Sequence, residues 1–408
     1  MRSRRGVRLV AILLSGAVLS SCQLTTPSSS TAPAPSTTVV SEPTSATAVA
    51  TPTRAPTAQP GAMLSDLAVQ IPAGTGSALT PAFSPDVTEY SMRVDSDISA
   101  VGVVASPAGG DGVRIEIAGQ VATLGQASVV SVGVGSSRVE VEVTAADGTA
   151  RSTYAIEIER RDMTPVIDRF QKLSFTDSAT GETMGYRLFV PDGYDRSKSY
   201  PLVLFLHGAG ERGSDNEAQL TANEGATVWA TPEEQAKHPA FVLAPQSGST
   251  PKTEGWTTIA THGQNDPFRP QKELVTAFDI LQRVTSEYSV DAHRIYVTGV
   301  SQGGFGTYAI AIAHPQEFAA LVPICGGGDP AKLAAIAQVP IWIFHAAKDP
   351  TVRAGYSRNS VAALKKAGGH PRYTEYPADA YFYPTAHASW TTTYANQEMR
   401  DWLFDQSR

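Results

Sequence analysis

The sequence predicts an all-β sandwich followed by a mostly parallel α/β sheet with helices on both faces. Residues 62–161 alternate apolar and polar positions in short runs between Gly and Asp turns, which is typical of a sandwich of antiparallel strands. In residues 165–408, short apolar runs alternate with helical stretches, which is typical of parallel strands joined by helices. A chain of 408 residues with 42% hydrophobic composition is long enough for one large domain and a smaller one.

Residues 1–21 have the form of an export signal. Four arginines precede an apolar stretch that is shorter than a typical membrane span, and small residues then lead into Cys22. The run LSSC that ends at Cys22 resembles a bacterial lipobox, in which the cysteine becomes the lipid-bearing first residue of the mature protein. The alternative is ordinary secretory cleavage with an incidental cysteine. We therefore expect an extracytoplasmic lipoprotein, held at the membrane or cell surface through a lipid on Cys22.

Residues 22–61 are expected to form a disordered tether. They consist almost entirely of Thr, Ser, Pro and Ala, with too few apolar side chains to offset the entropy of an ordered chain. Such a segment would hold the folded part away from the membrane or carry it through a cell-wall layer.

The charge and the cysteine content of the sequence argue against a nucleic-acid partner and against an intrachain disulfide. The formal net charge is only −7 and no long basic run occurs, so nucleic acid is not an expected partner. The chain has two cysteines, and if Cys22 carries lipid, Cys325 has no partner for an intrachain disulfide. We expect Cys325, at the end of an apolar run, to be a buried structural thiol.

The first folded segment carries a family resemblance. The stretches LSDLAV, LTPAFSPDVTEYSMRV and VEVEVTAADGTARSTYAIEIERR resemble the cadherin-like, immunoglobulin-like β-sandwich domain of many bacterial surface proteins. The sequence departs from that family at Ala118-Gly119, where Asn-Gly is common, so the central hairpin is expected to turn differently. The resemblance implies a spacer or packing partner, with glycan binding as the alternative.

The second segment is predicted to contain seven strands and four long helices. The strands are expected in YRLFV, PLVLFLH, AFVLAPQ, RIYVTG, ALVPIC, PIWIFH and RYTEY. The helices are expected in PQKELVTAFDILQRVTSEY, GGFGTYAIAIAHP, YSRNSVAALKKAG and, as one last helix, YANQEMRDWLFDQ.

Ser301 is the candidate nucleophile. It lies in Gly299-Val300-Ser301-Gln302-Gly303, which fits G-x-S-x-G and stands between the strand RIYVT and the helix GGFGTYAIAIA. Such a turn places the serine in a strained backbone conformation, and glycines two residues before and after it remove side chains that would collide. The alternative is an ordinary serine in a glycine-rich loop.

A serine hydroxyl needs a base and an acid that orients the base. On this type of sheet the chain order is Ser, then Asp or Glu, then His, so only the histidines after Ser301 are candidates. Among these, His387 follows the last strand, where a loop reaches the carboxyl edge of the sheet, and it is the best base. The others are expected in packing, capping or edge positions: His314, His345 and His370.

Asp349 is the candidate acid, because it comes just past the carboxyl end of the strand PIWIFH. Asp329, after the strand that follows the serine turn, is the alternative acid. Glu375 and Asp379 lie too near the final strand to be favoured. A turn-initiating role for Asp349-Pro350 is the structural alternative.

The tetrahedral intermediate that forms when the serine attacks a carbonyl carries an oxyanion, and two backbone N–H groups are needed to stabilise it. Gln302 supplies one through its place after the serine. The second is expected from the loop after an early strand, LFLHGAGERGSDN, at Ala209 or at the adjacent Gly210. His207, which begins this loop, is expected to shape it.

The segment that contains these candidate site residues carries a second family resemblance. The pieces YRLFVPDGYD, YPLVLFLHGAGERGSDN, RIYVTGVSQGGFGTY, IFHAAKDPTV and AHASW resemble the α/β-hydrolase group of polyhydroxybutyrate depolymerase-like esterases, feruloyl-esterase-like enzymes and predicted peptidases. By this resemblance Trp256 overlies the active-site cleft and contacts substrate; the alternative is a core position. Glu211 lies either near the substrate or, with Arg212, in a salt bridge that stiffens the oxyanion loop.

The expected activity is that of a serine carboxylic ester hydrolase which forms an acyl-enzyme on Ser301 and needs neither a metal nor a cofactor. Its expected substrate is a small-molecule or polymeric ester with a short-chain, aryl or polyester-like structure. A serine peptidase is the alternative, because the same triad cleaves amides. A surface adhesion or glycan-binding protein with an inert hydrolase domain is the alternative from another class, because anchor, tether and sandwich are features of display.

Overall fold

The computed structural model describes residues 58–178, 180–248, 255–258 and 267–408. The expected signal peptide, Cys22 and the tether as far as residue 57 lie outside the described residues. Within the described ranges, no helix combines the length and the apolar composition that are needed to cross a bilayer.

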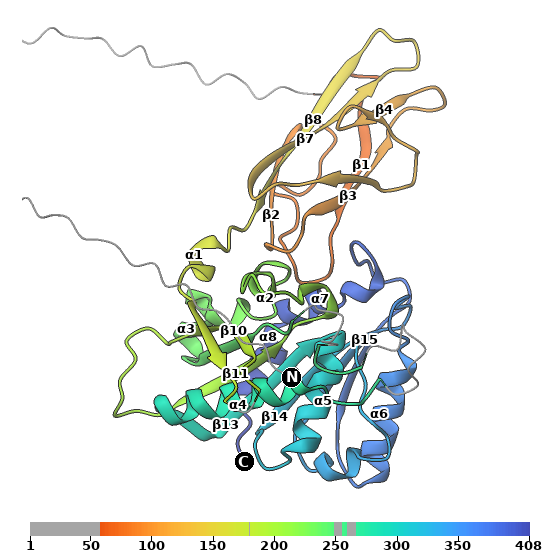
Figure 1. Cartoon of the computed structure of the whole chain (residues 1–408). Helices are drawn as coiled ribbons and strands as arrows, with labels where there is room; N and C mark the ends of the chain where they lie inside the picture. Colours follow the sequence, from red (N-terminus) through yellow and green to blue (C-terminus); the bar gives the residue numbers. More distant parts are fainter. Residues whose placement is uncertain (1–57, 179, 249–254, 259–266) are drawn as a thin grey trace, which may run out of the picture. The chain divides into compact units, whose positions relative to one another are not determined.

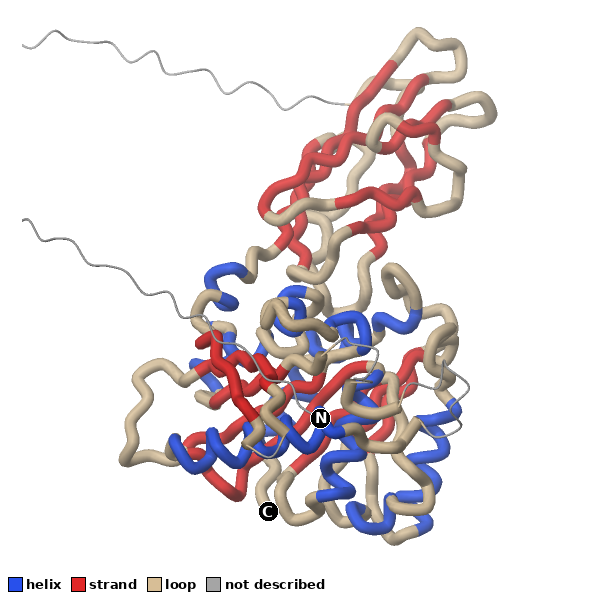
Figure 2. Tube along the Cα trace, in the orientation of Figure 1, coloured by secondary structure: helices blue, strands red, loops and turns tan. Residues whose placement is uncertain are grey.

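Residues 64–160 form two sheets that face each other across one hydrophobic core (Figures 1 and 2). The smaller sheet has the order β1 (Leu64–Gln70), β3 (Ala100–Pro107), β6 (Ser128–Ser131). The larger has the order β2 (Glu89–Val94), β8 (Arg151–Arg160), β7 (Gly135–Thr144), β4 (Arg114–Ile117), β5 (Gln120–Val121). The predicted sandwich is confirmed. One detail differs, because β2 runs parallel to β8 whereas the alternation predicted antiparallel strands throughout.

Side-chain alternation explains the sandwich core. On β7, Val139, Val141 and Val143 are buried, while the residues between them face solvent, as the period of two along a strand requires. The turn between β4 and β5 contains Ala118 and Gly119, both in the left-handed region with φ of 48° and 75°. Asn and Gly favour this conformation, so Ala118 occupies a position at which the commoner Asn would be less strained.

The second domain is built on an eight-stranded sheet with the order β16-β15-β14-β13-β11-β12-β10-β9. The strands from β11 to β16 run parallel, and β9 and β10 form an antiparallel hairpin at one edge. The predicted fold class is therefore confirmed, with β9 as a strand that the pattern did not indicate. The bounds are β9 Gln171–Thr176, β10 Thr183–Phe189, β11 Tyr200–Leu206, β12 Phe241–Pro245, β13 Val290–Val300, β14 Ala320–Ile324, β15 Trp342–Ala346 and β16 Arg372–Tyr376.

Helices cover both faces of this sheet. The helices α4 (Lys272–Glu287), α5 (Gln302–Ala313) and α6 (Gly355–Lys366) are shown in Figure 1. On β11, Leu204 belongs to the hydrophobic cluster formed with these helices, and its neighbour Phe205 belongs to the cluster on the other face. A strand buried on both faces needs the continuous apolar run that this sequence has. The other helices are α1 (Thr164–Ile167), α2 (Ala218–Thr221), α3 (Pro232–Lys237), α7 (Trp390–Ala395) and α8 (Gln397–Phe404).

The last predicted helix is present as α8, but it begins at Gln397 rather than at Tyr394, because Tyr394 and Ala395 end the preceding helix α7. The break falls at Asn396, which has the extended backbone of an N-cap (φ −74°, ψ 104°). Its side chain accepts a hydrogen bond from Met399 N at 3.2 Å and so begins α8 anew.

Candidate active site

Ser301 lies on a strained turn between β13 and α5. Its backbone has φ 53° and ψ −116°, a conformation that residues with a Cβ rarely adopt. Close backbone approach explains the neighbouring glycine, because a Cβ at Gly303 would lie 1.8 Å from Leu206 O. The strand–turn–helix setting expected for this serine is present.

Ser301, His387 and Asp349 form one hydrogen-bonded array. His387 Nε2 lies 3.0 Å from Ser301 Oγ, and His387 Nδ1 lies 2.7 Å from Asp349 Oδ2. His387 is carried by the 3₁₀ turn Ala386–Ala388, and its backbone N–H donates to Thr385 Oγ1, which begins that turn. Residues far apart in the chain are thus brought together in the order and geometry that a serine hydrolase requires.

The surroundings of Asp349 favour its ionised form. Burial opposes its ionisation, but hydrogen bonds from His345 and His387 outweigh it and hold the pKa of the carboxyl well below its usual range. Backbone N–H groups of Thr351 and Val352 donate to Asp349 Oδ1 at 2.8 and 2.9 Å. A carboxylate held in this way can fix the orientation and tautomer of His387.

The alternative acid, Asp329, is occupied elsewhere. It forms an ion pair with Lys332 at 3.1 Å and accepts a hydrogen bond from Ala331 N. Glu375 likewise bonds to Arg358 and Tyr373. The structure therefore brings Asp349, and neither of these carboxylates, to the imidazole.

The loop after β11 lies beside the serine. Ala209 opens the 3₁₀ turn Ala209–Glu211, and Arg212 Nε donates to Ala209 O at 2.8 Å. His207 is fully buried and is held by Ser247 N, which donates to its Nε2 at 3.0 Å. Burial lowers the pKa of His207 to about 4, so a neutral imidazole shapes this loop.

Trp256 is a core residue, which corrects the expected substrate contact. It is 0% exposed and belongs to the main hydrophobic cluster. Its indole Nε1 donates to His207 O at 2.8 Å, and its ring packs against the His207 ring at 4.8 Å between centroids. Burial arises because the indole fills the space above Gly306, whose added Cβ would lie 2.9 Å from Trp256 Cβ. Through these contacts Trp256 supports the loop that follows β11.

Glu211 approaches the nucleophile from the same loop. A Cβ at Gly208 would lie 2.9 Å from Glu211 Oε2 and 3.6 Å from Ser301 Cβ, so the carboxyl and the serine flank one glycine. Glu211 Oε2 is buried without a hydrogen-bond partner, and burial raises the pKa of this carboxyl. Among the described residues no ion pair joins Glu211 to Arg212, which instead bonds the loop backbone at Ala209 O.

Two residues support the array. Cys325 is buried, as the sequence predicted, and its Sγ accepts a hydrogen bond from Ser301 N at 3.2 Å, a contact that the sequence did not indicate. Burial raises the pKa of the Cys325 thiol, so it stays neutral. His345, expected only as a packing residue, lies with its Nε2 3.3 Å from Asp349 Oδ2.

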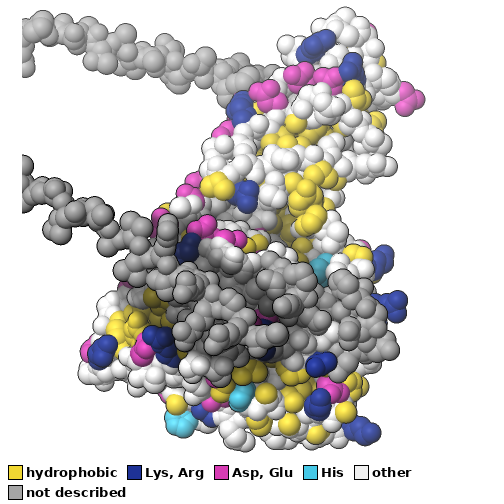
Figure 3. All heavy atoms as spheres, viewed as in Figure 1, with side chains coloured by type: hydrophobic (Ala, Val, Ile, Leu, Met, Phe, Trp, Pro, Cys, Tyr) yellow, Lys and Arg dark blue, Asp and Glu magenta, His cyan; other side chains and the backbone are white. Residues whose placement is uncertain are grey.

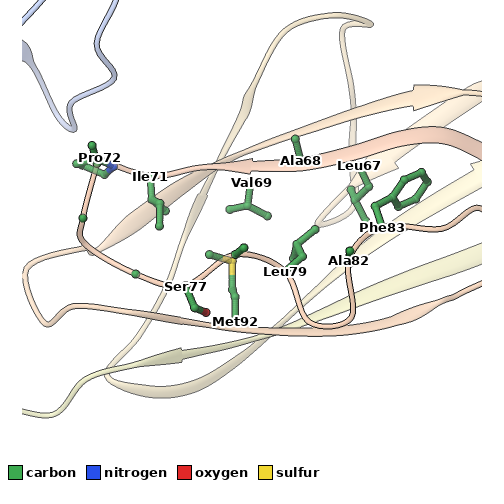
Figure 4. A pocket seen from close by; sticks show the side chains of 14 residues that line it. Leu67, Ala68, Val69, Ile71, Pro72, Ser77, Leu79, Ala82, Phe83 and Met92 are labelled. Atoms are coloured by element: carbon green, nitrogen blue, oxygen red, sulfur yellow. The ribbon is translucent and has the colours of Figure 1, made fainter.

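A separate cleft lies in the sandwich. Its volume is about 500 Å³, and its walls include Leu67, Val69, Leu79, Phe83 and Met92 (Figure 4). Hydrophobic side chains are also visible along the surface of this domain (Figure 3). Among the described residues that line this cleft, Ser77 is the one with a polar side chain, and none is acidic or basic.

Comparison with known proteins extends over both domains. A family model described as "Cadherin-like beta sandwich domain" matches residues 64–161, and one described as "Putative esterase" matches residues 178–367. Among solved structures, a thermostable esterase is 33% identical with a TM-score of 0.58, and the match covers 78% of this chain and 99% of that esterase.

Curated relatives match a shorter stretch. A probable feruloyl esterase C of Aspergillus terreus is 32% identical over 142 residues, which is 35% of this chain and 46% of the relative. The poly(3-hydroxyalkanoate) depolymerase C of Paucimonas lemoignei is 30% identical over 138 residues, which is 34% of this chain and 30% of the relative. The chain thus matches less than half the length of either curated relative.

The eight-stranded sheet, the strained serine turn and the Ser–His–Asp array define an α/β-hydrolase. Within that class, the match to nearly the whole thermostable esterase is decisive. The protein belongs to this esterase family and carries a cadherin-like sandwich at residues 64–161.

Proposed function

We propose that this protein is a serine esterase that hydrolyses carboxylic esters through an acyl-enzyme. The observation that carries the proposal is the continuous hydrogen-bonded line from Asp349 Oδ2 through His387 to Ser301 Oγ. The matching family model, a curated relative and a similar solved structure are all described as esterases, which supports an ester as the bond that is cleaved.

The first half-reaction follows from this geometry. His387 Nε2 takes the proton of Ser301 Oγ as that oxygen attacks the ester carbonyl. Backbone N–H groups of Gln302 and Ala209 stabilise the oxyanion, and Asp349 stabilises the imidazolium. His387 then protonates the departing alcohol, and the acyl group stays on Ser301.

Water completes the cycle. His387 takes a proton from a water molecule, whose oxygen attacks the acyl carbonyl and releases the carboxylic acid from Ser301. Every proton in both half-reactions passes through His387 Nε2, and no metal enters a step. Short-chain, aryl and polyester-like esters are the proposed substrates, in keeping with relatives named feruloyl esterase and poly(3-hydroxyalkanoate) depolymerase.

The test is hydrolysis by the full chain and by Ser301→Ala of p-nitrophenyl acetate, butyrate and octanoate, methyl ferulate and a peptide anilide. We expect Ser301-dependent turnover of esters, and labelling by a fluorophosphonate that Ser301→Ala and His387→Ala abolish. Turnover of the anilide alone would make the protein a peptidase. Folded protein without Ser301-dependent turnover or labelling would indicate a display protein with an inert domain.

We propose further that the enzyme acts outside the cytoplasm, held by a lipid on Cys22. The support is the arginine-rich start, the short apolar run and the small residues before Cys22. Metabolic labelling with an alkyne fatty acid is expected to tag the wild-type chain and not Cys22→Ser. Equal labelling of both chains, or none of the wild type, would overturn this assignment.

A further inference from the structure

A second cluster of ionisable side chains, separate from the Ser301 array, lies between α3 and α8. Glu234 on α3, His238 at its end and Asp401 on α8 each offer one ligand-capable atom, and these three atoms lie within 4.8 Å of one another. None of the three residues takes part in the Ser301 array. Their arrangement therefore needs its own explanation.

Glu234 is the unusual member. Its side chain is only 2% exposed, and Oε2 is paired with Arg400 Nε at 2.9 Å. Oε1 is buried with no hydrogen-bond partner and lies 4.0 Å from His238 Nε2. A buried carboxylate oxygen without a hydrogen-bond partner is costly. Because Glu234 Oε1 is also near the imidazole of His238, the arrangement is suited to binding a cation.

A hydrogen bond alone does not satisfy this cluster. His238 Nε2 lies 3.0 Å from Asp401 Oδ1, and a proton on that nitrogen bonds the aspartate. The same proton cannot also reach Glu234 Oε1 at 4.0 Å. A cation shared by the three atoms would satisfy all of them.

We propose that Glu234, His238 and Asp401 bind one divalent transition-metal ion of the zinc class. Zinc bonds nitrogen and oxygen at about 2.0–2.2 Å, so two ligand atoms on one ion lie at most about 4.4 Å apart. The separations of 3.0 Å and 4.0 Å from His238 Nε2 fall within that limit. One imidazole with two carboxylates favours zinc over magnesium or calcium, which prefer oxygen alone.

Each ligand is oriented by a second side chain. Arg400 fixes Glu234, Gln397 Nε2 donates to Asp401 Oδ1 at 2.7 Å, and the His238 ring stacks on Phe404 at 4.5 Å. Such outer contacts are typical of built metal sites. The Asp401 side chain is 47% exposed, which leaves an entry path and room for a water ligand.

The nearby positive charge does not exclude the ion. Glu234 and Asp401 contribute two negative charges, and Arg400 and Lys237 two positive charges, so the cluster is balanced when His238 is neutral. Arg400 pairs with Glu234 Oε2, which leaves Oε1 available to the ion. The ion would join α3 to α8, the helix whose Met399 and Leu403 pack into the core. Its expected role is to hold the C-terminal helix in place, with no part in the ester chemistry.

The experiment is calorimetric titration of chelator-treated full chain with Zn²⁺, paired with thermal unfolding. We expect one Zn²⁺ per chain and, at a hundredfold excess over Kd, a rise in Tm of about 5–10 °C. His238→Gln and Asp401→Asn should each weaken binding at least tenfold, since each removes one ligand. His370→Gln, at an exposed histidine, is the matched control and should bind as the wild type does.

The array around Ser301 supplies the decisive comparison, because Cys325, Asp349 and His387 also lie close enough to hold an ion. His387→Gln should keep the zinc, and ester hydrolysis by His238→Gln will show that this variant is folded. Loss of zinc in His387→Gln rather than in His238→Gln would overturn the proposal. So would a Kd weaker than about 100 μM or a Tm that zinc leaves unchanged.

Discussion

His345 Nε2 lies 3.3 Å from Asp349 Oδ2, and neither side chain is exposed to solvent. The same carboxylate oxygen lies 2.7 Å from His387 Nδ1. His345 is itself held by Ser357 Oγ at 2.7 Å. Asp349 is therefore fixed between two imidazoles, and its orientation toward His387 does not depend on one contact alone.

Asp349→Asn is expected to lower kcat for p-nitrophenyl butyrate by about 10⁴-fold with little change in KM. The amide cannot stabilise the imidazolium and favours the wrong tautomer of His387. Steady-state kinetics of the purified variant measure this loss. Asp329→Asn is the matched control and should stay within about twofold of wild type, because Asp329 is paired with Lys332. A large loss in Asp329→Asn with none in Asp349→Asn would reverse the assignment of the acid.

Glu211→Gln is expected to change how the stability of the protein depends on pH. Burial raises the pKa of Glu211 above its ordinary value of 4.5 in the folded protein. The folded state then holds a proton that the unfolded chain has lost, so wild-type stability falls relative to Glu211→Gln as pH rises above 4.5. Denaturant unfolding at several pH values tests the sign, and a difference that grows in favour of wild type with rising pH would refute it.

Gly303→Ala is expected to destabilise the fold by about 3 kcal/mol and to abolish activity. Its added Cβ would lie 1.8 Å from Leu206 O and 2.7 Å from His207 O, and these backbone atoms cannot move aside as the end of a flexible side chain could. Gly355→Ala, at the first residue of α6, is the matched control, because nothing lies within 4 Å of a Cβ there. Denaturation midpoints and ester turnover compare the two variants, and a stable, active Gly303→Ala would contradict the tight turn.

Asn396→Ala is expected to lower the free energy of unfolding by about 1 kcal/mol, because α8 loses its N-cap. Asn359, exposed on α6, is the control, since alanine there is at least as good a helix former. Chemical denaturation of both variants measures the difference. Equal stabilities would show that Asn396 does not set the start of α8.

The serine turn and the two-faced sheet follow from local sequence. Gly299, Ser301 and Gly303 encode a backbone turn that only small residues permit, and it can be recognised wherever a strand precedes it and a helix follows it. The apolar runs of β11 and β14 similarly require burial on both faces. The candidate base and acid were found because chain order and strand ends restrict the choice to few residues.

Contacts between distant segments could not be predicted in this way. The two imidazoles on Asp349, the burial of Trp256 behind His207, and the parallel pairing of β2 with β8 join residues that no local pattern relates. The cluster of Glu234, His238 and Asp401 likewise exists only because α8 returns to lie against α3.

The sequence by itself therefore determined the order of the domains, the fold class and the serine turn, because strand period, helix period and glycine positions act within a few residues. Tertiary structure decided between Asp349, which the sequence favoured, and Asp329 as the carboxylate that meets His387, and it alone decided that Trp256 is buried and where the last helix begins. These outcomes depend on packing between segments far apart in the chain, where small shifts in strand end or helix axis decide which side chains come within hydrogen-bond distance.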